Sequence, residues 1–313
     1  MKRRESGVAA LTAVLIVAIA ASAAALMLAQ ESATLDQAMM VAARAQADQY
    51  AEAGLDWARG VLLQDAQSGT AVDSLDEGWA QPIAALPVER AIVAGDIVDE
   101  QGKFNLNNLV VNGQRSDDDV EIFKRLIASL DLPPELADAV IDWIDPDDRL
   151  TSGAGAEDEY YLALPRPYRA ANQPMQQVEE LYRVRGFDAA TVAKLLPYVT
   201  ALPAVTRTTI NANTASALVL AAALPTIPRE AIDQMVARRT TKPFPSADAL
   251  AQWVQSIDPH ASPTALDVKS GYFSVHVKVT QDDVRVATEA LVERDAGAGL
   301  PPTTWVVWQR PSY

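Results

Sequence analysis

The sequence contains no cysteine and only two histidines, His260 and His276, among its 313 residues. The absence of cysteine excludes disulfides, thiolate metal sites and cysteine nucleophiles. Two histidines argue against a histidine-rich zinc site. The chain also lacks nucleophile-elbow, phosphate-loop, dinucleotide-binding and zinc-protease motifs, so nothing in it predicts an enzyme.

Basic residues are also scarce. The chain has 26 lysines and arginines against 41 aspartates and glutamates, which gives a formal net charge of −15 and a pI near 4.5. Because affinity for nucleic acids comes largely from neutralised phosphates, this charge argues against non-specific DNA or RNA binding. The length suits about two globular domains, and 49% hydrophobic residues imply an apolar excess in one part of the chain.

That apolar excess lies at the amino terminus. Proline is absent from the first 81 residues, and Gly54 is the only glycine between residues 8 and 59. Residues 8–29 carry no charge and, as a helix, would cross a bilayer core of about 30 Å. Three basic residues precede this run, which predicts a cytoplasmic amino terminus and an acidic body on the other side. A cleaved secretory signal is the alternative, but its apolar core would be shorter.

The helical pattern continues beyond the predicted membrane span. Apolar residues recur on one helical face at Leu35, Met39, Ala42, Tyr50, Ala53, Trp57 and Val61. One helix from the membrane to about Leu63 would be about 80 Å long. Its membrane half, residues 8–29, cannot be buried in its own globule, and its second half, residues 30–63, is amphipathic. This helix therefore favours assembly with other helices.

Strand-like segments occur on both sides of a long helical region. Residues 88–98 predict a hairpin with its turn at 94–96, and residues 273–279 and 284–292 alternate between apolar and polar positions. Between them, apolar periodicity typical of helices extends over 111–263. The prediction is an α+β fold, in which an antiparallel sheet domain (64–110 and 264–295) is interrupted by a helical domain (111–263). A C-terminal tail of 296–313 follows.

An acidic loop is the densest group of chemically active residues. Its seven carboxylates are accompanied by a single cation, Arg149, and belong to Asp142, Asp145, Asp147, Asp148, Glu157, Asp158 and Glu159. We expect the first four of these to follow a helix end. Such a group is either solvated or neutralised by a hard cation with oxygen ligands, for which extracytoplasmic calcium is suited. The spacing is not that of an EF-hand, and adjacent acids suit a cation better than a glycosidase pair.

The amino terminus resembles the class III leader of type IV pilins and type II secretion pseudopilins. The matching residues are a short basic leader that ends in Ser6 and Gly7, followed by a long helix from Val8. The resemblance implies that a prepilin peptidase cleaves between Gly7 and Val8, leaving residues 1–7 as a leader. Most such subunits carry glutamate at the fifth mature position, where this chain has Thr12. The substitution is either a sign of a filament tip with nothing stacked above it or a tolerated small polar residue.

The body is similar to the general secretion pathway protein K family, the largest minor pseudopilins of type II secretion. The similarity rests on Asp142–Asp147, Gly155–Tyr161, Pro167–Asn172, Glu179–Leu181, Leu196–Val199 and Ile210–Ala215. It implies calcium bound by Asp142, Asp145, Asp147, Glu157 and Asp158. It also implies a tip complex with minor pseudopilins of the I and J types, and contact with the major pseudopilin, the inner-membrane assembly platform and secreted substrates. The implied location is the bacterial inner membrane, with one span and a periplasmic body.

Residues 210–250 suggest an alternative function. They resemble a helix-hairpin-helix module of membrane-anchored competence DNA receptors, and the helical domain has helix-hairpin-helix or SAM-like character. Such hairpins use glycines, which let backbone N–H groups approach a phosphate. This chain has Pro225 and Pro228 there, and proline has no N–H to donate. We therefore interpret the hairpin as a packing unit, with Asn213 or Thr214 as the cap of the following helix.

Overall fold

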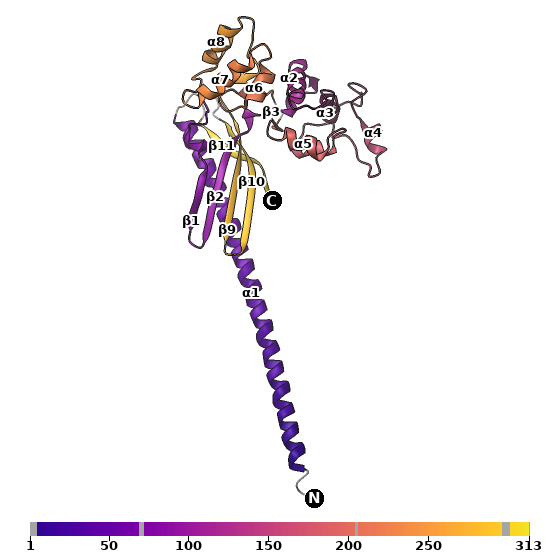
Figure 1. Cartoon of the computed structure of the whole chain (residues 1–313), viewed down its shortest axis with the longest axis vertical. Coiled ribbons are helices and arrows are strands. Elements are labelled where there is room, and N and C mark those ends of the chain that lie inside the picture. Colours follow the sequence, from indigo (N-terminus) through magenta and orange to yellow (C-terminus); the bar gives the residue numbers. More distant parts are fainter. Residues whose placement is uncertain (1–4, 69–71, 204–205, 296–300, 313) are drawn as a thin grey trace.

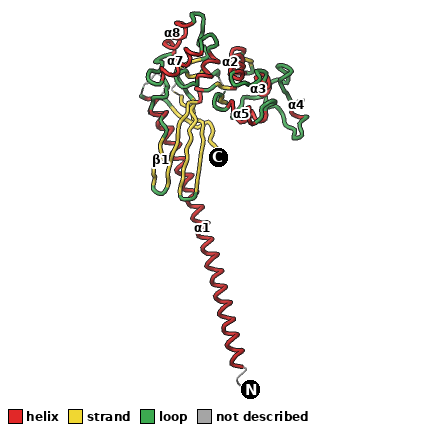
Figure 2. Tube along the Cα trace, viewed as in Figure 1, coloured by secondary structure: helices red, strands yellow, loops and turns green. Residues whose placement is uncertain are grey.

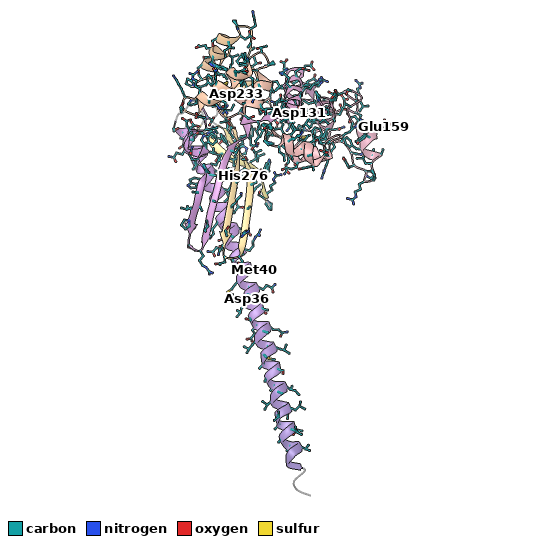
Figure 3. The ribbon with its side chains drawn as sticks, viewed as in Figure 1. Asp36, Met40, Asp131, Glu159, Asp233 and His276 are labelled. Atoms are coloured by element: carbon teal, nitrogen blue, oxygen red, sulfur yellow. The ribbon has the colours of Figure 1, made fainter. Side chains whose placement is uncertain are left out.

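A computed structural model describes residues 5–68, 72–203, 206–295 and 301–312. A single long helix, α1 (Glu5–Gln67), extends from a head that contains the described residues after it (Figure 1). At 1.5 Å per residue it is about 95 Å long. Side chains of its lower part, Met40 among them, project without contacting the head (Figure 3). The helix predicted to about Leu63 therefore forms and continues for one further turn.

The elements that follow α1 are strands, α-helices and short 3-10 helices. The strands are β1 (Ile83–Val88), β2 (Ala91–Asp99), β3 (Phe104–Asn105), β4 (Val110–Val111), β5 (Gln114–Arg115), β6 (Val199–Thr200), β7 (Ile210–Asn211), β8 (Leu266–Asp267), β9 (Tyr272–Gln281), β10 (Val284–Asp295) and β11 (Thr303–Pro311). The α-helices after α1 are α2 (Asp117–Ala128), α3 (Leu136–Ile144), α4 (Asp158–Leu162), α5 (Ala189–Leu195), α6 (Ala217–Ala223), α7 (Arg229–Arg239) and α8 (Ala247–Ile257). The 3-10 helices are η1 (Gly78–Ala80), η2 (Glu100–Gly102), η3 (Leu106–Leu109) and η4 (Val178–Arg183).

The main sheet has the order β1-β2-β9-β10-β11, and every neighbouring pair is antiparallel. The strands lie together beside the upper part of α1, and the inserted helices lie beyond one end of the sheet (Figure 2). Alternate residues of β9 and β10 face α1, as the apolar alternation predicts. The core between them contains Ala47, Ala51, Leu55, Ala58, Leu62, Phe273, Val275, Val277, Val279, Val286, Ala290 and Val292. The predicted α+β fold is confirmed.

Two local predictions for the sheet differ from the structure. The β1–β2 turn lies at Glu89, which has a φ of 51°, and β2 runs straight through residues 94–96. Gly95 is needed for close packing, because a Cβ there would lie 2.5 Å from the carbonyl oxygen of His276. The expected tail also contains a strand: β11 pairs with β10 from Thr303 to Pro311. It pairs with the edge of β10 that β9 leaves free.

The inserted domain has one apolar core that extends through two lobes, α2–α5 and α6–α8 (Figure 1). Short parallel pairs, β3 with β6 and β7 with β8, join its segments. Ser216 caps α6 by accepting from the Val219 N–H, so neither Asn213 nor Thr214 is the cap. Those two side chains instead form hydrogen bonds to distant segments of the chain: Asn213 donates to the Phe244 carbonyl and Thr214 donates to Asp99.

Gly54 marks a close approach of α1 to the sheet. A Cβ at this position would lie 2.8 Å from Cγ1 of Val277, so we expect Gly54→Val to destabilise the head by about 1 to 3 kcal/mol through overpacking. Gly60 lies further along the same helix, and a Cβ added there would have no atom within 4 Å. Gly60→Ala should therefore stabilise by about 0.5 to 1 kcal/mol. Urea unfolding of both variants measures the contrast, and equal midpoints would contradict the packing described here.

Candidate functional site

The structure brings three of the predicted carboxylates together. Asp142 lies in the last turns of α3, Asp145 is the C-cap of that helix, and Glu157 is the N-cap of α4. Asp142 is thus inside the helix, not beyond its end as the sequence pattern suggested. One oxygen from each residue lies within 4.8 Å of the others, and Asp142 and Glu157 are 0% and 5% exposed. The loop between α3 and α4 therefore folds back to close a carboxylate pocket.

Several oxygens of this pocket have no partner among the described residues. Oδ2 of Asp142, Oδ1 of Asp145 and both carboxylate oxygens of Glu157 are buried without a hydrogen bond. The backbone N–H of Thr151 donates to Oδ1 of Asp142 at 2.9 Å, which leaves Oδ2 turned to the pocket. Unpaired buried charges cost several kcal/mol, roughly, unless a counter-ion compensates them. These oxygens are therefore candidate ligands for a cation.

The pKa values of the three carboxyl groups show the same imbalance. Burial, followed by the charges of Asp142 and Asp145, raises the pKa of Glu157 to about 8. Burial and the neighbouring Asp147 raise the pKa of Asp145 to about 6. Burial also raises the pKa of Asp142. Each shift means that the surroundings disfavour the carboxylate form, and a bound cation would reverse this preference.

The other two predicted ligands lie apart from these three. Asp158 accepts from Arg169 at 2.5 Å and from the backbone N–H of Ala170, so its charge is already compensated. Asp147 is exposed and accepts from the backbone N–H of Arg149. Asn172 was not identified as a candidate from the sequence. Its Nδ2 lies 3.3 Å from Oδ1 of Asp148, while its own Oδ1 is buried and unpartnered. This oxygen is therefore an additional candidate metal ligand beside the loop.

A second carboxylate cluster provides an internal comparison. Asp65, Asp73 and Glu77 also place oxygens within 4.8 Å of one another. Here, however, Arg294 pairs with both aspartates, and Glu77 accepts from the indole N–H of Trp79 at 2.7 Å. Arg294 compensates part of the charge of this cluster, and each of its three carboxylates has a hydrogen-bond partner. The contrast shows that proximity of carboxylates alone does not define a cation site, whereas unpartnered oxygens do.

The residues of the first cluster fit a hard cation. Three carboxylates offer up to six oxygens, and calcium takes six to eight at about 2.3 to 2.6 Å. Gly155 makes room for this set, because a Cβ there would lie 1.9 Å from Oδ2 of Asp142. The ring of Tyr161 packs against Trp143 with centroids 5.2 Å apart and closes the inner side of the loop. Both aromatic residues are buried, whereas the neighbouring Tyr160 is exposed.

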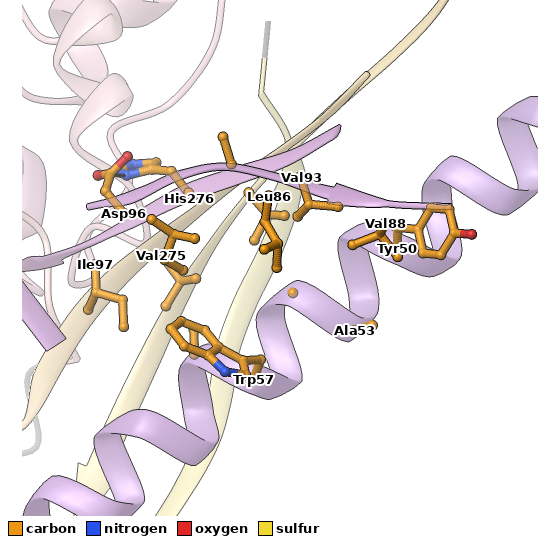
Figure 4. Close-up of a pocket in the computed structure, with 16 residues that line it drawn as sticks. Tyr50, Ala53, Trp57, Leu86, Val88, Val93, Asp96, Ile97, Val275 and His276 are labelled. Carbon is orange, nitrogen blue, oxygen red and sulfur yellow. Dashed lines mark hydrogen bonds and ion pairs between the residues drawn. The ribbon is translucent and has the colours of Figure 1, made fainter. Parts of the chain in front are cut away.

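The second feature with functional potential is an apolar groove between α1 and the β1–β2 hairpin (Figure 4). It has a volume of about 290 Å³ and is lined mainly by Tyr50, Ala53, Trp57, Leu86, Val93 and Val275. Trp57 and Leu86 are 53% and 55% exposed, which is unusual for side chains of this size. The groove continues the exposed apolar face of α1 that begins at Leu35 and Met39.

The membrane half of α1 carries no acidic side chain from Val8 to Ala29. Its most apolar window has a mean hydropathy of 2.5 and is entirely exposed, so this helix is long and apolar enough to cross a membrane. The Thr12 hydroxyl donates to the carbonyl oxygens of Val8 at 3.1 Å and Ala9 at 2.9 Å. Because its hydrogen bond is made inside its own helix, Thr12 requires no partner there.

A long apolar helix, free in its first half and packed on an antiparallel sheet in its second, defines a pilin-like subunit whose helix is long and apolar enough to span a membrane. Two domain families described as type II secretion system protein K match residues 102–204 and 210–269. The chain belongs to the type II secretion system protein K family, whose members are minor pseudopilins.

Individual relatives agree with this assignment. The chain is 33% identical to type II secretion system protein K of Pseudomonas aeruginosa, over 94% of this chain and 90% of the relative. It is 32% identical to protein K of Aeromonas hydrophila, over 93% and 94% of the two chains. Its fold matches a chain in the crystal structure of the GspK-GspI-GspJ complex from enterotoxigenic Escherichia coli with a TM-score of 0.69 and 26% identity, covering 86% and 96% of the two chains.

Proposed function

We propose that this minor pseudopilin caps the tip of the type II secretion pseudopilus together with subunits of the I and J types, and helps to initiate the filament. The position of the head carries the proposal. The lobe that contains α6–α8 lies beyond the distal end of α1 and of the sheet (Figure 1), so it obstructs the place where another subunit would be added. Thr12 supports the same role, since it offers no carboxylate to a subunit above.

The apolar groove supplies the surface for this assembly. Its occupant in our proposal is the apolar N-terminal helix of a neighbouring pilin-like subunit, because the groove continues the face of α1 that needs a helical partner along its whole length. In this arrangement the amino terminus is cytoplasmic, α1 crosses the inner membrane once and the head lies in the periplasm. The crystal structure of a related chain with GspI and GspJ supports the choice of partners.

Substitution of Trp57 tests whether a partner helix docks in the groove. We expect Trp57→Ala to reduce co-purification with I- and J-type subunits by about tenfold or more, because large aromatic side chains in grooves dominate interface energies. Ile257→Ala is the matched control, since Ile257 is an exposed apolar residue (37%) on α8 and outside the groove. Equal recovery of both variants would contradict docking in the groove. Cross-links between copies of this chain along the shaft would contradict the tip position.

Processing at Gly7 forms a separate part of the proposal. After co-expression with prepilin peptidase, the intact mass should show loss of residues 1–7, so that the mature chain begins at Val8. The variant Gly7→Asp should retain these residues, because the peptidase of this family cuts after a glycine. A wild-type chain that keeps its leader, or one cut near residue 25, would contradict the assignment of the leader.

Calcium completes the proposed function. In our proposal Asp142, Asp145 and Glu157 hold the ion, and the unpartnered Oδ1 of Asn172 is a further candidate ligand. The bound charge would remove the electrostatic cost of the buried carboxylates and fix the connection between α3 and α4. This connection forms the outer part of the inserted domain (Figure 1), so the ion would stabilise the head and take no part in chemistry.

A further inference from the structure

Four charged residues form a row across the main sheet on the face opposite α1. Asp96, His276, Glu289 and Arg310 lie on β2, β9, β10 and β11, and each is the direct register partner of the next. Nδ1 of His276 is 2.9 Å from Asp96, and its Nε2 is 3.6 Å from Glu289. Nε of Arg310 donates to Glu289 at 3.0 Å. Charges of opposite sign therefore alternate along the row when His276 is protonated.

The row continues into the inserted domain. Nη2 of Arg310 donates to the Glu179 carboxylate at 2.7 Å, and Nη1 donates to the Gln177 side chain at 2.8 Å. Glu179 lies in η4 and Gln177 is its N-cap. Figure 4 shows Asp96 and His276 side by side, away from Trp57 and α1. The guanidinium of Arg310 thus joins the sheet to the inserted domain and is shared by two carboxylates, Glu179 and Glu289.

The His276 side chain is partly exposed to solvent and has few charged neighbours. Its side chain is 30% exposed, and it lines a cavity of about 250 Å³ with Asp96 and Lys278. Lys278 is exposed, two residues further along β9 on the same face. Among the described residues, Asp96 from β2 and Glu289 from β10 are the charged groups paired with His276, and Lys278 lies on the same face of its own strand.

We propose that this row is a pH-sensitive clamp between the sheet and the inserted domain, which holds while His276 is protonated and loosens when it loses that proton. Deprotonation leaves Arg310 as the only cation among the described residues that pairs with Glu289 and Glu179, and it leaves Asp96 facing a neutral imidazole. The two carboxylates then compete for one guanidinium, and their repulsion acts across the contact between the domains. This inference is independent of the tip proposal, because it concerns contacts within one chain.

The direction of the pH response follows from the equilibrium. Glu289 and then Asp96 raise the pKa of His276 above its ordinary value near 6.5, although burial opposes them. His276 in turn lowers the pKa of Glu289. Because the folded protein binds the imidazole proton more tightly than the unfolded chain does, the stabilisation is complete below about pH 6.5. It is lost as the pH rises through the higher pKa of the folded state.

Because the chain has no cysteine, two can be introduced as unique labelling sites. Thr280→Cys on β9 and Ala193→Cys on α5 are exposed positions on the two domains. The full chain, labelled with a donor and an acceptor dye in detergent, is observed by single-molecule energy transfer at about pH 5.5 and about pH 8.5. We expect the fraction of molecules with separated dyes to rise by about fivefold at the higher pH.

Variants in the labelled chain separate His276 from other groups that titrate in this range, such as Asp99, whose pKa burial raises to about 6. His276→Gln should be open at both pH values, and His276→Lys should be closed at both. Arg90→Gln removes an exposed cation paired with Asp282 and should behave as the unmodified chain. Circular dichroism checks that each variant is folded. An open fraction independent of pH in the wild-type chain, or an unchanged pH response in His276→Gln, would overturn the proposal.

Discussion

Calcium should raise the melting temperature of the full chain in detergent by about 5 to 10 °C, and a chelator should reverse the change. An ion at about a hundred times its dissociation constant stabilises the folded state by about 2.7 kcal/mol, and each kcal/mol moves the midpoint of a domain of this size by about 2 to 4 °C. The reason is the group of unpartnered oxygens on Asp142, Asp145 and Glu157. Differential scanning calorimetry with and without calcium measures the shift.

Two glycines of the same loop provide matched variants. Gly155→Ala should abolish most of the calcium response, because the added Cβ would occupy the position of Oδ2 of Asp142. Gly153→Ala should keep the response, since no atom lies within 4 Å of a Cβ at that position. Magnesium should act more weakly, because it keeps its water ligands and demands octahedral geometry. A wild-type melting temperature that is the same in calcium and in chelator would refute the cation site.

Arg294→Met should destabilise the head by about 3 to 5 kcal/mol, because it leaves the buried Asp73 and the partly buried Asp65 without their cation. Arg294 and Asp73 have side chains that are each 5% exposed, and Nη1 of Arg294 lies 2.7 Å from Asp65. The loss should be smallest at acidic pH. Without the guanidinium the folded state favours the protonated form of Asp65, whose pKa burial raises, so its stability falls as the pH rises through that pKa. Urea unfolding at several pH values measures both effects.

Arg90→Met is the control for this variant. Arg90 pairs with Asp282 at 2.9 Å, but the two side chains are 75% and 50% exposed. Exposed pairs contribute about 0 to 1 kcal/mol, so this variant should unfold near the wild-type midpoint at every pH. Similar losses for Arg90→Met and Arg294→Met would show that burial of the Arg294 cluster does not determine its contribution.

The long helix and the sheet could be predicted because each depends on a local pattern. The absence of proline up to residue 81 and the repeating apolar face indicated the course of α1, and apolar alternation identified β9 and β10. The turn after β1 could not be found in this way. Glu89 has no chemical preference for its left-handed conformation, whereas Gly95, which looks like a turn residue, is required for contact with β9.

The candidate cation site was predictable only in part, because composition reveals an excess of carboxylates but not their directions. The sequence shows that Asp142 and Glu157 belong to one acidic segment. It does not show that Arg169 reaches Asp158 and removes its charge from the group. Nor does it distinguish this segment from Asp65, Asp73 and Glu77, where a residue more than 200 positions away provides the cation. Partners that are distant in sequence decide which carboxylates remain available.

The place of the insertion in the sheet has a consequence for the way such subunits can diversify. Strands β2 and β9 are adjacent, and Asp99 at the end of one is paired with Phe273 near the start of the other. Topologically, the whole helical domain is therefore the connecting loop of a single hairpin. Its size can change without altering the register of the strands that pack on α1, because the closing pair stays in place. A subunit with only a short turn between β2 and β9 would be expected to keep the same α1 and the same sheet packed on it. The size of the inserted domain and the packing of α1 within the fibre can therefore evolve separately.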